Sequence, residues 1–185
     1  MSAPDLLRSG SDGGRRPPRR VLLAAGLVLA LAVGGDRWQL SREQGALVRC
    51  VEGAESAAVY ADRQIAATAQ YAAPGLSGTA PAGVRASLQQ VLQQTAAKGI
   101  VPAQAARRRC SAVRILPWHA GQRRGRDTYV SFLRARTGQL RRVSQNFDAL
   151  STPSFDLGRS QAAALTALRT AVPSRANRLQ MLLSP

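Results

Sequence analysis

Few residues of this chain could do chemistry: one histidine, His119, and two cysteines, Cys50 and Cys110. Catalysis of the Ser-His-Asp kind would need His119 to meet a serine and a carboxylate in space, and no local motif marks such a nucleophile. There is no glycine-rich phosphate loop or run of metal ligands. Two cysteines and one distant histidine make a poor zinc site. We therefore expect no enzymatic activity, no cofactor and no metal.

The segment Pro117-Trp118-His119 is better interpreted as a corner between two helices. In such a corner we expect Trp118 to cover the edge of the core. We expect a backbone group to satisfy the hydrogen-bonding capacity of His119.

The two cysteines favour a disulfide over a pair of buried thiols. Each lies at or beside an apolar seam of an expected helix, and 60 residues separate them. Closing a loop of that length stabilises a domain by roughly 4 kcal/mol in the chain-entropy model. Disulfides persist in oxidising compartments, so the bond would accompany export from the cytoplasm.

Arginine dominates the charge of the chain, with 25 Arg and a single Lys among 185 residues and a formal net charge of +16. Residues 100–150 contain 11 of these arginines against two acidic residues. We predict a basic face that includes Arg107, Arg108, Arg109, Arg141 and Arg142. Arg forms forked contacts to phosphate and carboxylate, so an anionic envelope polymer or an acidic protein would fit, although a solvated surface explains the charge equally well.

The N-terminal region predicts a membrane segment. Residues 1–20 are polar, rich in Gly and Pro, and end in an arginine cluster, which indicates a disordered basic cytoplasmic tail. Fifteen uncharged residues follow over 21–35, and Arg37 and Trp38 then suit a membrane interface. Because arginines ahead of an apolar run stay on the cytoplasmic side, everything after it is expected outside. We assign residues 21–38 to a single transmembrane anchor.

A cleaved signal peptide is the alternative for the same segment. Fifteen helical residues span about 22 Å, which is short of a hydrocarbon core of roughly 30 Å. The pattern Ala30-Leu31-Ala32 also resembles a signal-peptidase site. In that case a secreted basic helical protein would be released by cleavage near Ala32.

Apolar periodicity predicts an all-α fold: a single N-terminal transmembrane helix that continues into an antiparallel extracytoplasmic helical bundle. The expected helical domain covers residues 39–173, and residues 174–185 form a short helix or tail. The expected helices span about residues 36–72, 81–99, 102–116, 127–150 and 156–172. A first-helix seam of Leu40, Leu47 and Val51 could face this bundle or a second copy of the chain.

These expectations combine into a membrane-anchored extracytoplasmic binding or scaffolding module of the bacterial cell envelope. A nucleic-acid-binding protein is the other alternative, because phosphate neutralisation needs only a basic surface. The lack of interleaved aromatic residues and the expected location outside the cytoplasm make nucleic acid an unlikely partner.

Overall fold

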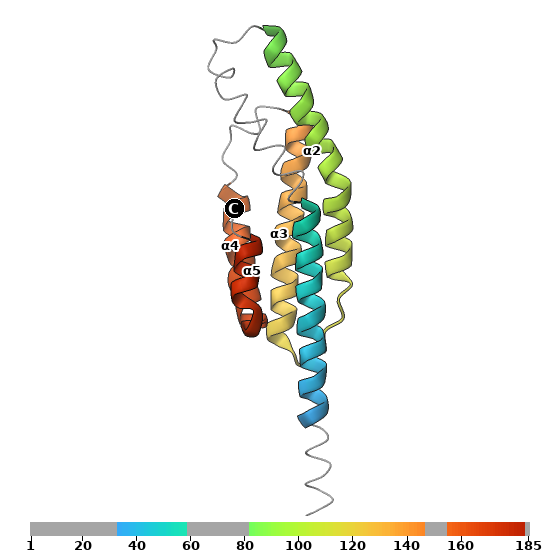
Figure 1. Cartoon of the computed structure of the whole chain (residues 1–185), viewed down its shortest axis with the longest axis vertical. Helices are drawn as coiled ribbons and strands as arrows, with labels where there is room; N and C mark the ends of the chain where they lie inside the picture. The colour runs from blue at the N-terminus through green and yellow to red at the C-terminus, as the bar shows by residue number, and fades with distance from the viewer. Residues whose placement is uncertain (1–32, 59–81, 147–154, 184–185) are drawn as a thin grey trace, which may run out of the picture. The chain divides into compact units, whose positions relative to one another are not determined.

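The computed structural model describes residues 33–58, 82–146 and 155–183. The chain divides into two compact units, Met1–Gln39 and Leu40–Pro185. In the described part all regular structure is helical, which confirms the expected all-α class (Figure 1). The helices are a first helix over residues 33–58, α2 (Ala82–Ser111), α3 (Ala120–Gln145), α4 (Phe155–Ala171), the 3-10 turn η3 (Pro173–Arg175) and α5 (Ala176–Leu183).

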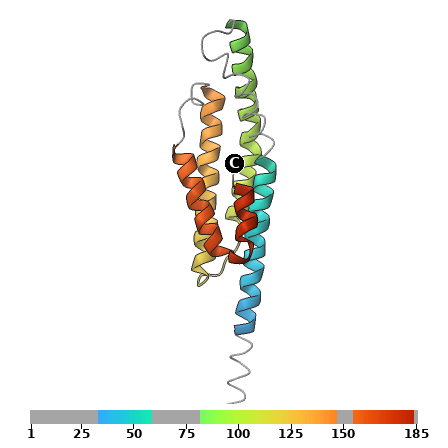
Figure 2. The same ribbon diagram turned by 60° about the vertical axis from the view of Figure 1, so that its left-hand side comes forward.

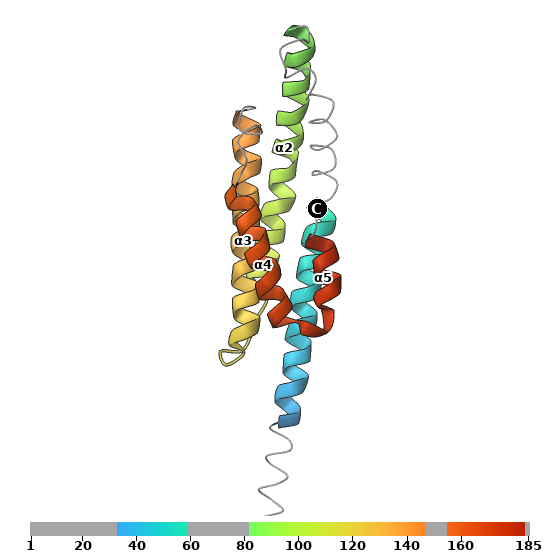
Figure 3. The same ribbon diagram turned by 90° about the vertical axis from the view of Figure 1, so that its left-hand side faces the viewer.

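The second unit is a bundle in which successive labelled helices fold back on one another. α2 and α3 are joined by the loop 112–119 and lie side by side, and α4 returns along α3 (Figure 2). The turn η3 then reverses the chain, so that α5 lies beside residues 40–58 of the first helix (Figure 3). The first helix is therefore in contact with several other elements of the bundle.

The core confirms the predicted seam of the first helix where the structure describes it. Leu47 and Val51 are fully buried, and Ala54 is 4% exposed. They pack in one cluster with Tyr129, Leu133, Leu168 and Leu179 from α3, α4 and α5. Leu47 and Val51 therefore face their own bundle, and the alternative in which they face a second copy is not supported. The predicted continuation of this helix to residue 72 lies outside the described residues beyond residue 58.

The predicted break between residues 99 and 102 is wrong, because the helices expected over 81–99 and 102–116 are a single helix, α2, with Pro102 inside it. Proline lacks an N–H and crowds the preceding turn, which costs about 3 kcal/mol in a helix interior. Packing on both sides offsets that cost, because Ile100 and Ala103 pack beside Leu140 and Ala106 is buried in the main core. Figure 1 shows α2 bending gently along its length.

α2 also departs from the prediction in its exposed face and in its end. In the sequence Val84, Val91 and Leu92 lie on one apolar face at helical spacing, but Val84 and Val91 are 49% and 48% exposed, whereas Leu92 is fully buried. The helix ends at Ser111, several residues before Pro117. The chain leaves the helix early because residues 113–116 make tertiary hydrogen bonds: Arg126 Nη1 donates to Val113 O, and Leu116 N donates to a glutamate of the first helix.

The C-terminal residues belong to the bundle. Leu168 and Val172, which continue the apolar spacing of the helix expected over 156–172, are buried, and Pro173 follows the end of α4. Beyond it, Leu179 and Leu183 of α5 are 0% and 3% exposed and join the core. α5 thus extends the helical domain past residue 173, where we expected only a short helix or tail.

Among the described residues, no helix is both long and apolar enough to cross a bilayer. Residues 21–32, which form most of the expected anchor, lie outside the described residues, as do the expected tail over 1–20 and Phe147 and Leu150 of the helix predicted over 127–150. Arg37 and Trp38 are helical and exposed, and Trp38 is 63% exposed.

Candidate functional site

Both cysteines of the chain join the first helix to α2 in a disulfide. Cys50 and Cys110 are bonded, with their Cα atoms 5.4 Å apart, inside the usual range for a disulfide. Cys110 is fully buried, and Cys50 packs against the same cluster. The pairing expected from the sequence is therefore present, and it crosslinks two helices at the core.

The chain contains three glutamates, Glu43, Glu52 and Glu55, and all three lie on the first helix. Each contacts a different part of the bundle. The apolar periodicity of the first helix gave no sign of these contacts, because a glutamate in a helical pattern normally indicates a solvated face.

Glu43 holds the corner between α2 and α3. Its carboxylate is 2% exposed and accepts two hydrogen bonds, from Leu116 N at 2.9 Å and from His119 Nδ1 at 2.6 Å. Because a carboxylate accepts, the hydrogen bond places a proton on Nδ1 of His119. A buried charge needs this kind of compensation.

The predicted corner at residues 117–119 exists, but two details of it are wrong. His119, which is 7% exposed, bonds to the Glu43 side chain rather than only to backbone groups. Trp118 does not cover the core, since 67% of it is exposed. The corner closes on the Glu43 carboxylate, so the indole is left at the surface. The described contacts of His119 position the loop and the start of α3.

Glu55 holds α3 through two side chains. Tyr129, which is fully buried, donates its hydroxyl to Glu55 Oε1 at 2.6 Å, and Arg136 Nη1 lies 2.9 Å from Glu55 Oε2. Burial raises the pKa of Tyr129 far above its ordinary value, and the negative charge and hydrogen bond of Glu55 raise it further. The Tyr129 hydroxyl therefore remains a donor at any ordinary pH. The Arg136 guanidinium also lies over the Phe132 ring, 5.8 Å from its centre.

Glu52 points toward α5, where Arg178 Nε lies 2.6 Å from its Oε1. All three glutamates are thus engaged within the bundle. Among residues whose burial the structure describes, the exposed carboxylates are Asp36 and Asp127. Asp127 Oδ1 lies 2.8 Å from Arg126 Nη2. The described surface of the bundle is consequently more basic than the composition alone implies.

The arginines of the predicted basic face fall at two levels of the bundle. Arg107, Arg108 and Arg109 lie in the last turns of α2, next to the loop 112–119, while Arg141 and Arg142 lie in the last turns of α3. α2 and α3 fold back on each other, and Ala96 of α2 packs with Val143 of α3. The two groups are therefore separated by roughly ten residues of helix, about 15 Å at 1.5 Å per residue. Arg107 is half-buried and the other four are exposed.

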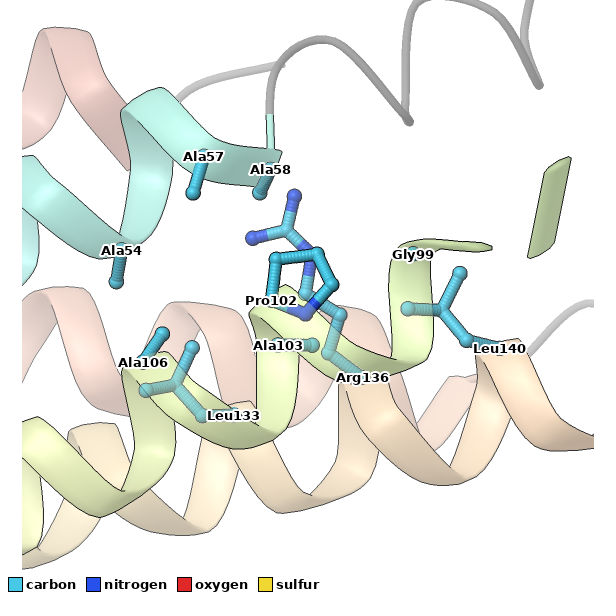
Figure 4. A pocket seen from close by; sticks show the side chains of 10 residues that line it. All are labelled: Ala54, Ala57, Ala58, Gly99, Pro102, Ala103, Ala106, Leu133, Arg136 and Leu140. Carbon is cyan, nitrogen blue, oxygen red and sulfur yellow. The ribbon is translucent and has the colours of Figure 1, made fainter. Parts of the chain in front are cut away.

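A small pocket lies where the first helix, α2 and α3 meet (Figure 4). Its volume is about 10 Å³, enough for about one water molecule. Alanines and Pro102 line much of it, and the Arg136 side chain extends across it toward Ala58. A ligand site usually takes several hundred Å³, so this pocket does not accommodate a substrate or cofactor.

Comparisons of the chain with protein-family models, with curated proteins and with solved structures found no match.

Proposed function

We propose that this chain is a single-pass, membrane-anchored, extracytoplasmic helical module of the bacterial cell envelope that binds or scaffolds an acidic partner. The observation that carries the proposal is the Cys50–Cys110 disulfide between the first helix and α2. A crosslink in the core of an ordinary domain is stable where the surroundings are oxidising. The uncharged run over 21–35, with arginines before it, is the segment that would deliver the domain there.

The charge distribution supports a binding role for the bundle surface. Because the three glutamates are used within the fold, few described carboxylates remain at the surface to neutralise exposed arginines such as Arg108, Arg109 and Arg141. A phosphate- or carboxylate-bearing polymer, or an acidic protein, fits the forked geometry of arginine. We found no constellation among the described residues that argues for catalysis, so binding is the role we put forward.

Export is tested in living cells by alkylating the thiols before and after reduction and by fusing a topology reporter to the C-terminus. We expect the reporter outside the cytoplasm, both sulfurs protected from alkylation until reduction, and an N-terminus that still begins at Met1 or Ser2 in the membrane fraction. Leu27→Arg with Leu29→Arg interrupts the apolar run and should leave both thiols reduced, because charges at a helix centre oppose insertion. The matched control, Leu6→Arg with Leu7→Arg in the preceding tail, should be exported normally.

A cytosolic reporter with reduced thiols in the unaltered chain overturns the proposal. A soluble chain that begins just after Ala32 supports the secreted protein in place of the anchored one.

The binding role is tested by crosslinking in cells. Two variants are made: one reverses the charge of Arg107, Arg108 and Arg109, and the other reverses the charge of Arg141 and Arg142. Whichever group binds an anionic partner should show weaker crosslinking to that partner when its charge is reversed. An unchanged crosslinking pattern in both variants removes these arginines from the binding role.

A further inference from the structure

One end of the bundle, which we call the entry end, is where the chain enters it at Leu40. Glu43 brings the loop 112–119 to this end through its bonds to Leu116 N and His119. The last carbonyl of α4, Ala171 O, accepts hydrogen bonds from Gln44 at 3.2 Å and Gln122 at 3.0 Å. The entry end therefore comprises the loop 112–119, the first turns of α3 and the turn η3 (Figures 1 and 2).

The entry end is strongly basic and carries an exposed tryptophan. Residues 107–126 contain seven arginines and no acidic residue. Arg114, Arg123 and Arg124 are exposed, and so is Arg175 on η3. Of the carboxylates near this end, Glu43 is buried and engaged by His119, and the exposed Asp127 is paired with Arg126. Trp118, on the loop, is 67% exposed.

We infer that the entry end docks on the headgroups of anionic lipids in the bilayer that holds residues 21–38; this inference rests on the proposed anchor. Leu40 follows Trp38 by two residues in the sequence, so the bundle begins directly after the proposed anchor. Charges interact over about 8 Å at physiological ionic strength, so docking requires these arginines to come within that distance of lipid phosphates. Arginine pairs with phosphate through two N–H groups, and an indole partitions to the headgroup level.

Position favours lipid over a soluble acidic partner for this particular surface. The anchor keeps the entry end at the bilayer at all times, so docking is intramolecular with respect to the membrane and needs no encounter. Each arginine near an anionic surface contributes about fivefold to the partition. Three such residues together would change the ratio of docked to undocked domain by about a hundredfold.

The test uses the full chain in nanodiscs with 5-fluorotryptophan at its two tryptophans, Trp38 and Trp118. Trp118→Phe assigns the two ¹⁹F resonances. Lipids with a nitroxide on the headgroup then broaden the resonance of any indole close to the bilayer surface. We expect Trp38 to be broadened in both neutral phosphatidylcholine and phosphatidylglycerol-containing discs. We expect Trp118 to be broadened only when phosphatidylglycerol is present, and to recover at high salt.

A charge-matched pair of variants tests the electrostatic basis. Replacing Arg114, Arg123 and Arg124 by Gln should abolish the broadening of Trp118. Replacing Arg134, Arg141 and Arg142 by Gln removes the same charge from the far half of α3 and should leave it intact. Equal loss in both variants, or broadening in neutral lipid alone, overturns the inference. Broadening of Trp38 without Trp118 overturns docking but leaves the anchor standing, whereas broadening of neither overturns both.

Discussion

Glu55 illustrates how a buried carboxylate is compensated in this fold. A charge taken out of water needs donors, and Glu55 receives one from the neutral Tyr129 hydroxyl and one from the Arg136 guanidinium. Both donors come from α3, where they are seven residues, or about two turns, apart on the same face. The pairing therefore fixes the register between the first helix and α3 as well as satisfying the charge.

The raised pKa of Tyr129 makes the stability of the bundle sensitive to alkali. The unfolded chain ionises Tyr129 near pH 10, while the folded chain keeps the proton. The stability that the folded state gains by keeping Tyr129 protonated is therefore fully present below pH 10. Above pH 10 the free energy of unfolding falls by up to about 1.4 kcal/mol per pH unit. Tyr129→Phe should be about 1 to 3 kcal/mol less stable at pH 7 and should lose less stability between pH 10 and 11. Denaturant unfolding at each pH measures both effects, and parallel pH curves for the two proteins would contradict the assignment.

Glu43 supports a second prediction at the same scale. Glu43→Ala leaves Leu116 N and His119 Nδ1 without their acceptor, so we expect about 3 kcal/mol lower stability. Hydrogen exchange at the Leu116 amide should accelerate at the same time, because that N–H loses its protein partner. Ser41→Ala, an exposed substitution two residues away, is the control and should change neither quantity by much. Unaltered exchange at Leu116 in Glu43→Ala would show that the carboxylate does not hold the loop.

At the scale of elements, α3 and α4 approach each other closely at Gly125. A Cβ placed on Gly125 would lie 2.7 Å from the Ala171 Cβ and 3.3 Å from the Ala167 carbonyl oxygen. Neither atom is the far end of a flexible side chain, so the two helices would have to separate. Separation would also disturb the hydrogen bonds from Gln44 and Gln122 to Ala171 O beside this crossing. Gly125 is thus required by packing rather than by backbone conformation.

Alanine substitution at two glycines of the same helix should have opposite effects. Gly125→Ala should destabilise the bundle by about 1 to 3 kcal/mol through overpacking. A Cβ on Gly138 would have no neighbouring atom within 4 Å. Gly138→Ala should therefore stabilise the bundle by up to about 1 kcal/mol, because alanine is the better helix former. Thermal unfolding of both variants in the same detergent gives the comparison. A Gly125→Ala protein as stable as Gly138→Ala would refute the close crossing.

The elements also show what apolar periodicity predicts and what it misses. The seam of the first helix and the inward face of α3, including Leu133, Leu140 and Val143, were predictable because their spacing repeats over several turns. The continuity of α2 was not, because Pro102 ordinarily ends a helix and only packing against α3 offsets its cost. Arg136 stands between Leu133 and Leu140 in the apolar spacing of α3, and this interruption of the apolar face was the available sign of a buried partner such as Glu55.

At the scale of the whole molecule, negatively and positively charged side chains are distributed differently between the interior and the surface. The three glutamates of the first helix carry negative charge into the bundle, and at the described exterior the exposed arginines outnumber the two exposed aspartates, Asp36 and Asp127. The candidate basic surface could be located on the sequence, but its separation into two levels could not. That separation follows from the reversal of the chain between α2 and α3, which places the ends of these helices far apart.

The disulfide is the device at this scale that we expect to matter most for stability. The bundle has a thin core built largely from alanine, valine and leucine, and the Cys50–Cys110 bond closes a loop of 60 residues within it. In the chain-entropy model such a loop contributes about 4 kcal/mol, a large share of the 5 to 15 kcal/mol typical of a folded domain. Replacing both cysteines by alanine should therefore lower the free energy of unfolding by about that amount.

The role of the crosslink can be separated from that of the buried sulfur atoms by using reduction. If chain entropy dominates, the reduced unaltered protein and the double-alanine variant should unfold at nearly the same denaturant concentration, well below that of the oxidised protein. If packing of the sulfurs dominates, the reduced protein should instead resemble the oxidised one, because its thiols still fill the same space. Denaturation of the three proteins, followed by circular dichroism, distinguishes the two cases. The first outcome would also mean that the bundle is stable mainly in an oxidising compartment, as the proposed location requires.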